Sequence, residues 1–180
     1  MTTTTSQLLD LVVGELQAAN TAAGARVFKP GDWATSQANY PVLLVRATAE
    51  DKESLGNADV QFKVTATIQV VGRVSAPALA ADAGAANADE ALWALARQVE
   101  VAVINAYDLT ILLQQFPFVR TKVGFSAEGE QHQAEFVMEI GLEFYQGPED
   151  FCPPALTPIT EIDVELTTFP PAGERIALPQ

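Results

Sequence analysis

The spacing of hydrophobic positions along the chain predicts two helices and five strands. Apolar residues recur every three or four positions over residues 5–19 and again from 87 to about 107, which is typical of amphipathic helices. Apolar runs at 25–28 and 41–48, and strict alternation over 60–71, indicate strands. A further hairpin follows the second helix. The order αβββαββ predicts an α/β (α+β) domain in which a small mixed or antiparallel sheet is packed by two helices.

Local signals add detail to these elements. Thr4-x-x-Gln7 and Asn87-x-x-Glu90 are capping boxes that would begin the two helices. The run 41–48 is apolar on both faces and is therefore expected to be a central strand, whereas the polar residues 50–57 are expected to form a turn. In the strand at 60–71, the alternate residues from Val60 to Val70 should face the helices.

The last hairpin can be registered from its turn. A two-residue turn at Glu128-Gly129 predicts these pairs: Phe125 with His132, Val123 with Ala134, Val119 with Met138, and Lys122 with Glu135. The alternate residues of these strands, as far as Phe144, should join the helix-facing side. Three acids, Glu135, Glu139 and Glu143, then share the polar side.

The second helix has more apolar surface than one sheet can cover. Its inner stripe runs from Ala88 to Val103, but Trp93, Val101 and Ile104 lie off that stripe. A helix that is apolar on two sides needs two partners.

Composition divides the chain into a domain at 1–147 and an extended arm at 148–180. Seven of the eleven prolines lie in the last 34 residues. Within that arm Ile162, Val164 and Leu166 alternate with acidic residues, which predicts one isolated strand. Since a lone strand is unstable in water, it is expected to add to the edge of a sheet.

Charge and cysteine content narrow the function classes. The net charge of −13 argues against tight binding of nucleic acid, which requires clustered Lys and Arg. A single cysteine, Cys152, excludes an internal disulfide framework. The N-terminal stretch lacks the cationic region of a signal peptide, and no apolar run is long enough to cross a membrane. We therefore expect a soluble protein made in a cytoplasm.

Candidate chemistry is sparse, and we expect no enzyme, no cofactor and no metal site. His132 is the one histidine, and Ser126 should lie on the opposite face of the hairpin, which is poor geometry for a Ser–His dyad. Cys152 has no cationic neighbour to activate its thiol. The acidic stretch from Asp82 to Trp93 lacks the Gly and Glu that a calcium loop requires.

Several segments together resemble the tail terminator proteins of long-tailed bacteriophages and prophages of Gram-negative bacteria. The resemblance covers residues 5 to 168 and rests on VFKPGDWATSQANYPVLLVRA (27–47), KESLG (52–56), EVAVINA (100–106), LLQQFPFV (112–119) and SAEGEQHQAEFVMEIGLEFYQGPEDF (126–151). It implies a homo-hexameric ring that caps the tail tube, stops its polymerisation and joins the head connector. The implied partners are the tube protein, the connector or neck protein and, in a contractile tail, the sheath protein. DNA would pass through without specific binding.

The resemblance also implies a location in the virion tail or neck, after assembly in the host bacterial cytoplasm. Within that interpretation, one group of residues is expected at subunit or tube contacts: Lys29, Asp32, Trp33, Tyr40, Trp93, Ile162, Val164 and Leu166. A second group of acids would face the channel or a partner: Glu128, Glu130, Glu135, Glu139 and Glu143.

Alternatives remain for each of these assignments. Trp33 can equally be a loop aromatic that packs on its own core, and the acids can be a solvated strand face. The variant Trp33→Ala distinguishes the two roles considered for Trp33. If Trp33 is an interface residue, the variant should fold but be impaired in ring formation or tube capping. For the whole chain, the alternatives are another neck or head–tail joining subunit, or a monomeric cytosolic binding module or small enzyme.

Overall fold

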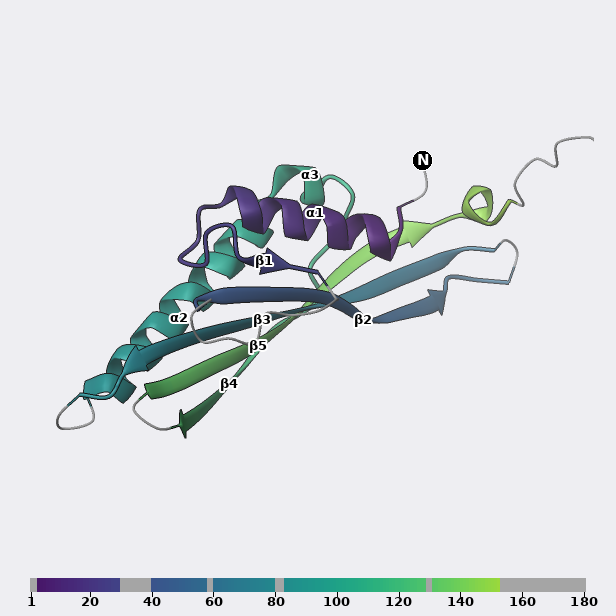
Figure 1. Cartoon of the computed structure of the whole chain (residues 1–180). Coiled ribbons are helices and arrows are strands. Elements are labelled where there is room, and N and C mark those ends of the chain that lie inside the picture. The colour runs from purple at the N-terminus through teal and green to yellow at the C-terminus, as the bar shows by residue number, and fades with distance from the viewer. Residues whose placement is uncertain (1–2, 30–39, 58–59, 80–82, 129–130, 153–180) are drawn as a thin grey trace, which may run out of the picture.

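The fold is a mixed sheet with helices on one face, seen in a computed structural model that describes residues 3–29, 40–57, 60–79, 83–128 and 131–152 (Figure 1). In the described residues the strand order is β1-β2-β3-β5-β4. This confirms the predicted α+β class. The elements are α1 (Thr5–Ala18), β1 (Val27–Phe28), β2 (Val42–Ser54), β3 (Phe62–Pro77), α2 (Ala83–Ile104), α3 (Tyr107–Thr110), β4 (Val119–Glu128), β5 (Gln131–Gln146) and the 3-10 turn η3 (Pro148–Phe151).

The two long helices follow their predicted stripes, but one of them begins earlier than expected. Thr4 caps α1, and its hydroxyl accepts a hydrogen bond from the backbone N–H of Gln7, as predicted. Helix α2 begins at Ala83, so Asn87 lies inside the helix and is not its cap. The early start has a local cause. The alanine-rich stretch favours helix, and Gly84 lets the first turn approach the Pro77 carbonyl, where a Cβ would overlap it.

Strand β2 is longer than its apolar run. It continues to Ser54 and pairs with β3 along its whole length, so the predicted turn over 50–57 is wrong. The polar composition has another cause: this part of the hairpin is exposed, and Figure 1 shows it extending beyond the helices. Cross-strand attraction supports it, since Lys63 forms an ion pair with Glu53 at 2.6 Å. On its other side β2 pairs in parallel with the two residues of β1, as far as the described part of the chain shows.

The register of the β4–β5 hairpin differs from the prediction by two residues. Glu128 pairs with Gln131, so residues 129–130 connect the strands, and the turn at Glu128-Gly129 is wrong. The observed pairs are Phe125 with Ala134, Val123 with Phe136, Val119 with Ile140, and Lys122 with Val137. Because side chains alternate with a period of two, a shift of two leaves every residue on its predicted face.

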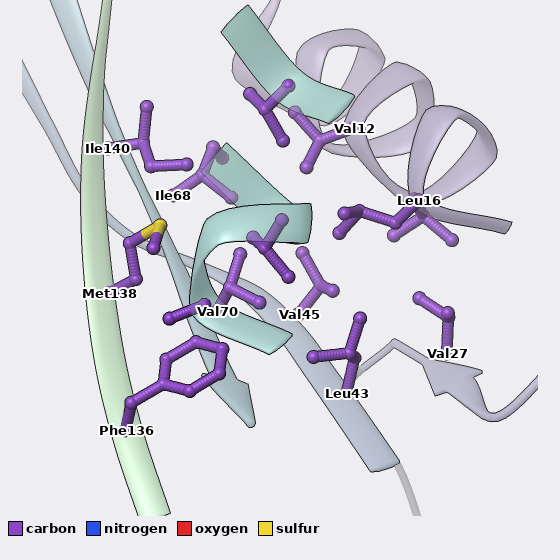
Figure 2. Packing of buried hydrophobic residues seen from close by; sticks show 14 of the residues in the cluster. Val12, Leu16, Val27, Leu43, Val45, Ile68, Val70, Phe136, Met138 and Ile140 are labelled. Atoms are coloured by element: carbon purple, nitrogen blue, oxygen red, sulfur yellow. The ribbon is translucent and has the colours of Figure 1, made fainter. Parts of the chain in front are cut away.

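The main core lies between the helices and the face of β2, β3 and β5 that they cover (Figure 2). The predicted inward residues Ile68, Phe136 and Ile140 are buried there, and Phe62 packs at its margin. Val60 is an exception, because it precedes β3 and is exposed. A smaller cluster of Val42, Leu44 and Val71 is buried on the opposite face, with Tyr40 and Val137 beside it, which explains why β2 is apolar on both sides. Besides the residues already named, the main core contains Leu8, Val12, Val13, Leu16, Leu43, Val45, Val64, Ala66, Val70, Leu92, Leu95, Val99, Val103, Leu109, Met138, Leu142 and Phe144.

Candidate interaction surface

The outer side of α2 carries an exposed apolar stripe. Trp93, Val101 and Ile104 are 49%, 41% and 36% exposed, although the inner stripe of the same helix is fully buried. Arg97 lies between them, and the spacings of four, four and three residues place all four side chains along one line of the helix. The sequence therefore predicted this second apolar side correctly, and no element of the described residues covers it.

The stripe continues into α3 and the segment after it. Tyr107 is 73% exposed and Ile111 is 60% exposed, while Leu109 between them is buried in the main core. We did not single out Tyr107 or Ile111 from the sequence. A signal was present, since the apolar residues over 107–113 exceed what a short connection needs. We call Trp93, Val101, Ile104, Tyr107 and Ile111 the outer helical face.

A second exposed apolar surface lies on β4, at the edge of the sheet. Val119, Val123 and Phe125 point to the same side of the sheet as the core, yet all three are exposed. Helix α2 packs on β3 and β5 and leaves β4 uncovered. The alternating pattern predicted that these residues lie on the apolar side, but it did not predict that their strand lies at an edge. Arg120 and Lys122 were the missed signal, because charged residues are typical of edge strands.

The predicted interface residues do not form one patch. Lys29 follows β1 and forms an ion pair with Asp10 of α1 at 2.5 Å. Tyr40 precedes β2 and packs against the small cluster on the sheet face opposite the helices. Trp93 belongs to the outer helical face. The remaining members lie outside the described residues: Asp32, Trp33, Ile162, Val164 and Leu166.

Three of the predicted acids share a face of the sheet but differ in environment. Glu135, Glu139 and Glu143 lie on the polar side of β5, as expected. Glu143 is buried, and its carboxylate accepts a hydrogen bond from the Gln115 amide at 2.8 Å, which gives it a packing role inside the chain. Glu128 is the last residue of β4 and pairs with Gln131 of β5. Glu130 lies outside the described residues.

Glu135 belongs to the main polar cluster of this face. Its carboxylate accepts from Arg73 Nε at 2.5 Å, across the β3–β5 pair. Burial disfavours the Arg73 charge, but hydrogen bonds and attraction from Glu135 and Tyr40 outweigh it and raise the pKa of Arg73. The three side chains border an open depression of about 340 Å³ that Gly124 and Ser126 of β4 complete. Arg73 and Glu135 neutralise each other's charge in this depression. Such a pair suits a structural contact better than proton transfer.

The residues considered for chemistry remain apart. Ser126 pairs with Gln133, so Ser126 and His132 lie on opposite faces, as predicted. His132 is half-buried beside the first turn of α2, and Cys152 is exposed with its Sγ 3.7 Å from the Pro148 carbonyl oxygen. Among the described residues, no cluster of three His, Cys, Asp or Glu side chains has the geometry to hold a metal ion.

Comparison with known proteins adds no family to this picture. No protein-family model matches the chain, and no curated protein matches it significantly. In the described part of the chain, no helix has the length and apolar character needed to span a bilayer.

Proposed function

We propose that this chain is a virion structural protein, a tail terminator that forms a homo-hexameric ring and acts at the end of tail assembly. It would cap the tail tube, end its polymerisation and present the joint to the head connector. The proposal rests on the sequence resemblance described above and on the surfaces of the folded chain. Its expected partners are copies of itself, the tube protein and the connector, with the sheath protein added in a contractile tail.

One observation carries the proposal: the subunit exposes two different apolar surfaces. The outer helical face lies on the helix layer, and the Val119, Val123 and Phe125 side chains lie on the edge strand. A ring requires this kind of subunit, because each copy contacts its neighbours through two non-identical surfaces. A symmetric dimer would need only one. Exposed Trp and Tyr, here Trp93 and Tyr107, are also the residue types enriched at the centres of protein interfaces.

The charge balance supports the same function. With a net charge of −13, the subunit repels the phosphate backbone, so a ring of such subunits would let DNA slide through its centre. The pairing of Arg73 with Glu135 removes one cation that could otherwise bind phosphate. Acidic surfaces also suit selective contact with a basic partner, so charge alone does not separate a tail terminator from another neck subunit.

Measurement of mass in solution tests ring formation directly. The expected result for the full chain is a species near six times 19.2 kDa by sedimentation or light scattering, alone or after addition of tube protein. Replacing Trp93 and Val101 together by Ser should abolish that species and leave the circular dichroism spectrum unchanged. Ala91→Ser is the matched control, because Ala91 is exposed on α2 but lies away from the stripe. A chain that stays monomeric with and without tube protein contradicts the proposal and favours the binding-module alternative.

Deletion of the gene from its phage or prophage tests the role in the particle. A terminator predicts tails of uncontrolled length in electron micrographs, since nothing ends tube growth. Tails of normal length that lack heads would instead identify a neck subunit that acts after termination. Normal infectious particles would exclude both functions.

A further inference from the structure

The edge strand β4 has features that specify what can pair with it. It is the last strand of the sheet order, so one side of its backbone has no neighbouring strand in the described residues. Its side chains alternate between Val119, Val123 and Phe125 on the helix side and Arg120 and Lys122 on the other side. A strand that paired here would need apolar residues at every second position and acids between them.

The two cations of β4 are available for such a partner. Lys29, Lys52, Lys63, Arg73 and Arg97 each form an ion pair with an acid of the same chain. Arg120 and Lys122 form none within the described residues. Arg120 lies over the Phe118 ring at 4.5 Å, and Lys122 is exposed beside Val137. In a chain with 23 acids and 10 basic residues, two neighbouring unpaired cations on one edge mark a site for an acidic segment.

The helix side of the same edge has space for apolar side chains. A hollow of about 270 Å³ lies between β4–β5 and the first turns of α2, lined by Phe125, His132, Ala85 and Ala88. The small side chains of α2 leave this space open. An added strand would place its alternate residues over Phe125 and toward this hollow, and would remove exposed apolar area from water.

One segment of the chain has the matching pattern. In Glu161-Ile162-Asp163-Val164-Glu165-Leu166, three β-branched or aliphatic residues alternate with three acids. Paired with β4, the apolar set falls beside Val123 and Phe125, and the acidic set falls beside Arg120 and Lys122. The same alignment satisfies both faces at once, because both strands have a period of two.

The path of the chain indicates that this segment comes from another copy. After β5, η3 brings Phe151 against Phe62 of β3, with ring centroids 5.5 Å apart, and Lys52 lies over the Phe151 ring. The chain therefore leaves β5 toward β3, on the side away from β4 (Figure 1). A return to Lys122 would cover about 30 Å along β5 and about 10 Å across two strands. The eleven residue steps from Cys152 to Asp163 span at most about 38 Å. A return that placed Asp163 beside Lys122 of the same chain would therefore need an almost fully extended connection.

We propose that residues 161–166 of one subunit add as a strand to β4 of a neighbouring subunit. The inference rests on the proposed function, because it requires copies held side by side. It assigns the arm a structural partner: each subunit would donate one strand and accept one, so the contacts close around a ring.

Disulfide trapping tests the contact, since Cys152 is the one cysteine of the sequence and Cys152→Ser gives a thiol-free background. One tagged chain carries Lys122→Cys, and a second carries Glu161→Cys, Asp163→Cys or Glu165→Cys in turn. After co-expression and mild oxidation, we expect one pairing to give at least about fivefold more crosslinked heterodimer than the control, because strand neighbours meet the distance that a disulfide requires. The control is the same arm variant with Ala91→Cys.

Charge reversal gives an independent readout. Arg120→Glu with Lys122→Glu should weaken self-association at least about tenfold, and an arm with Glu161→Lys, Asp163→Lys and Glu165→Lys should restore it. Crosslinking only within a single chain, or no crosslink above the control while the full chain still forms its ring, would overturn the inference and leave the proposed function standing. A chain that forms no oligomer under any condition contradicts both.

Discussion

At the scale of single residues, Gly72 shows how tightly the sheet face is packed. It pairs with Phe136, whose ring lies over it, and a Cβ at Gly72 would overlap that ring. Phe136 is fully buried and has no room to move aside. We therefore expect Gly72→Ala to lower the free energy of unfolding by about 1–3 kcal/mol, as overpacking of a core does. Urea unfolding followed by circular dichroism measures it.

The control for this prediction is Gly14→Ala. Gly14 is exposed in α1, and no atom lies within 4 Å of a Cβ built there. Alanine is a better helix former than glycine, so this variant should gain stability, by up to about 1 kcal/mol. Equal behaviour of the two variants would show that Gly72 is not chosen for close packing against Phe136.

Glu50 provides a pH-dependent contact between α1 and β2. Its carboxylate accepts a hydrogen bond from the Thr5 hydroxyl and forms an ion pair with Lys52 at 3.2 Å. The hydrogen bond from Thr5 lowers the pKa of Glu50. Partial burial opposes this shift, and Lys52 adds to it. A carboxyl with a lowered folded-state pKa stabilises the fold above its unfolded pKa, near pH 4.3, and loses that contribution as the pH falls through the folded pKa.

Glu50→Gln should therefore cost stability at pH 7, and the difference from the parent chain should shrink below about pH 4. Because water screens this partly exposed group, the expected loss is at most about 1 kcal/mol. Thermal unfolding of both chains from pH 7 to pH 3 measures the difference. A difference that stays constant over this range would mean that the charge of Glu50 makes no contribution.

At the scale of elements, α2 has two apolar sides with different roles. Leu95 is fully buried against the sheet, whereas Trp93 is half exposed. Leu95→Ala should lower the free energy of unfolding by about 2–5 kcal/mol through the cavity that it leaves. Trp93→Ala should change it by less than about 1 kcal/mol when measured on the dissociated chain. Chemical denaturation at low protein concentration separates these cases, and a large loss for Trp93→Ala would place Trp93 in the core.

The elements also show what a sequence can predict. Alternation identified the buried faces of β3 and β5, since side-chain direction follows directly from the strand period. It could not place the β4–β5 turn, because Glu128-Gly129 and Gly129-Glu130 are both acceptable turn sequences and both keep every residue on its face. The extension of β2 to Ser54 was also missed, because an exposed ribbon has no apolar period to detect.

The candidate surfaces divide in the same way. Trp93, Val101 and Ile104 were predictable, since a helical period distinguishes an inner stripe from an outer one. Val119, Val123 and Phe125 were not, because exposure there depends on which strands α2 covers, and that is a property of the tertiary arrangement. Local sequence sets the face of a residue, whereas the packing of distant elements decides whether that face is covered.

At the scale of the whole molecule, the net charge should govern the assembly of copies into the proposed ring. A subunit with a net charge of −13 would repel other copies, and the proposed ring would bring several of them within the screening length of about 10 Å at 0.1 M salt. The proposed contact of the arm with β4 works in the opposite direction, because Arg120 and Lys122 would attract its three acids. The net repulsion involves many more charges than this local attraction, so repulsion should dominate the salt dependence of assembly.

We therefore expect ring formation to strengthen as NaCl rises from about 20 mM to about 200 mM, where screening relieves the repulsion. Sedimentation at a fixed subunit concentration measures the fraction assembled. The variant with Arg120→Glu and Lys122→Glu should respond to salt more steeply than the parent chain, because it adds charge to the repulsion and removes the attraction. Assembly of the parent chain that weakens steadily over this range would mean that attraction between opposite charges holds the ring together, with the net charge playing the smaller part.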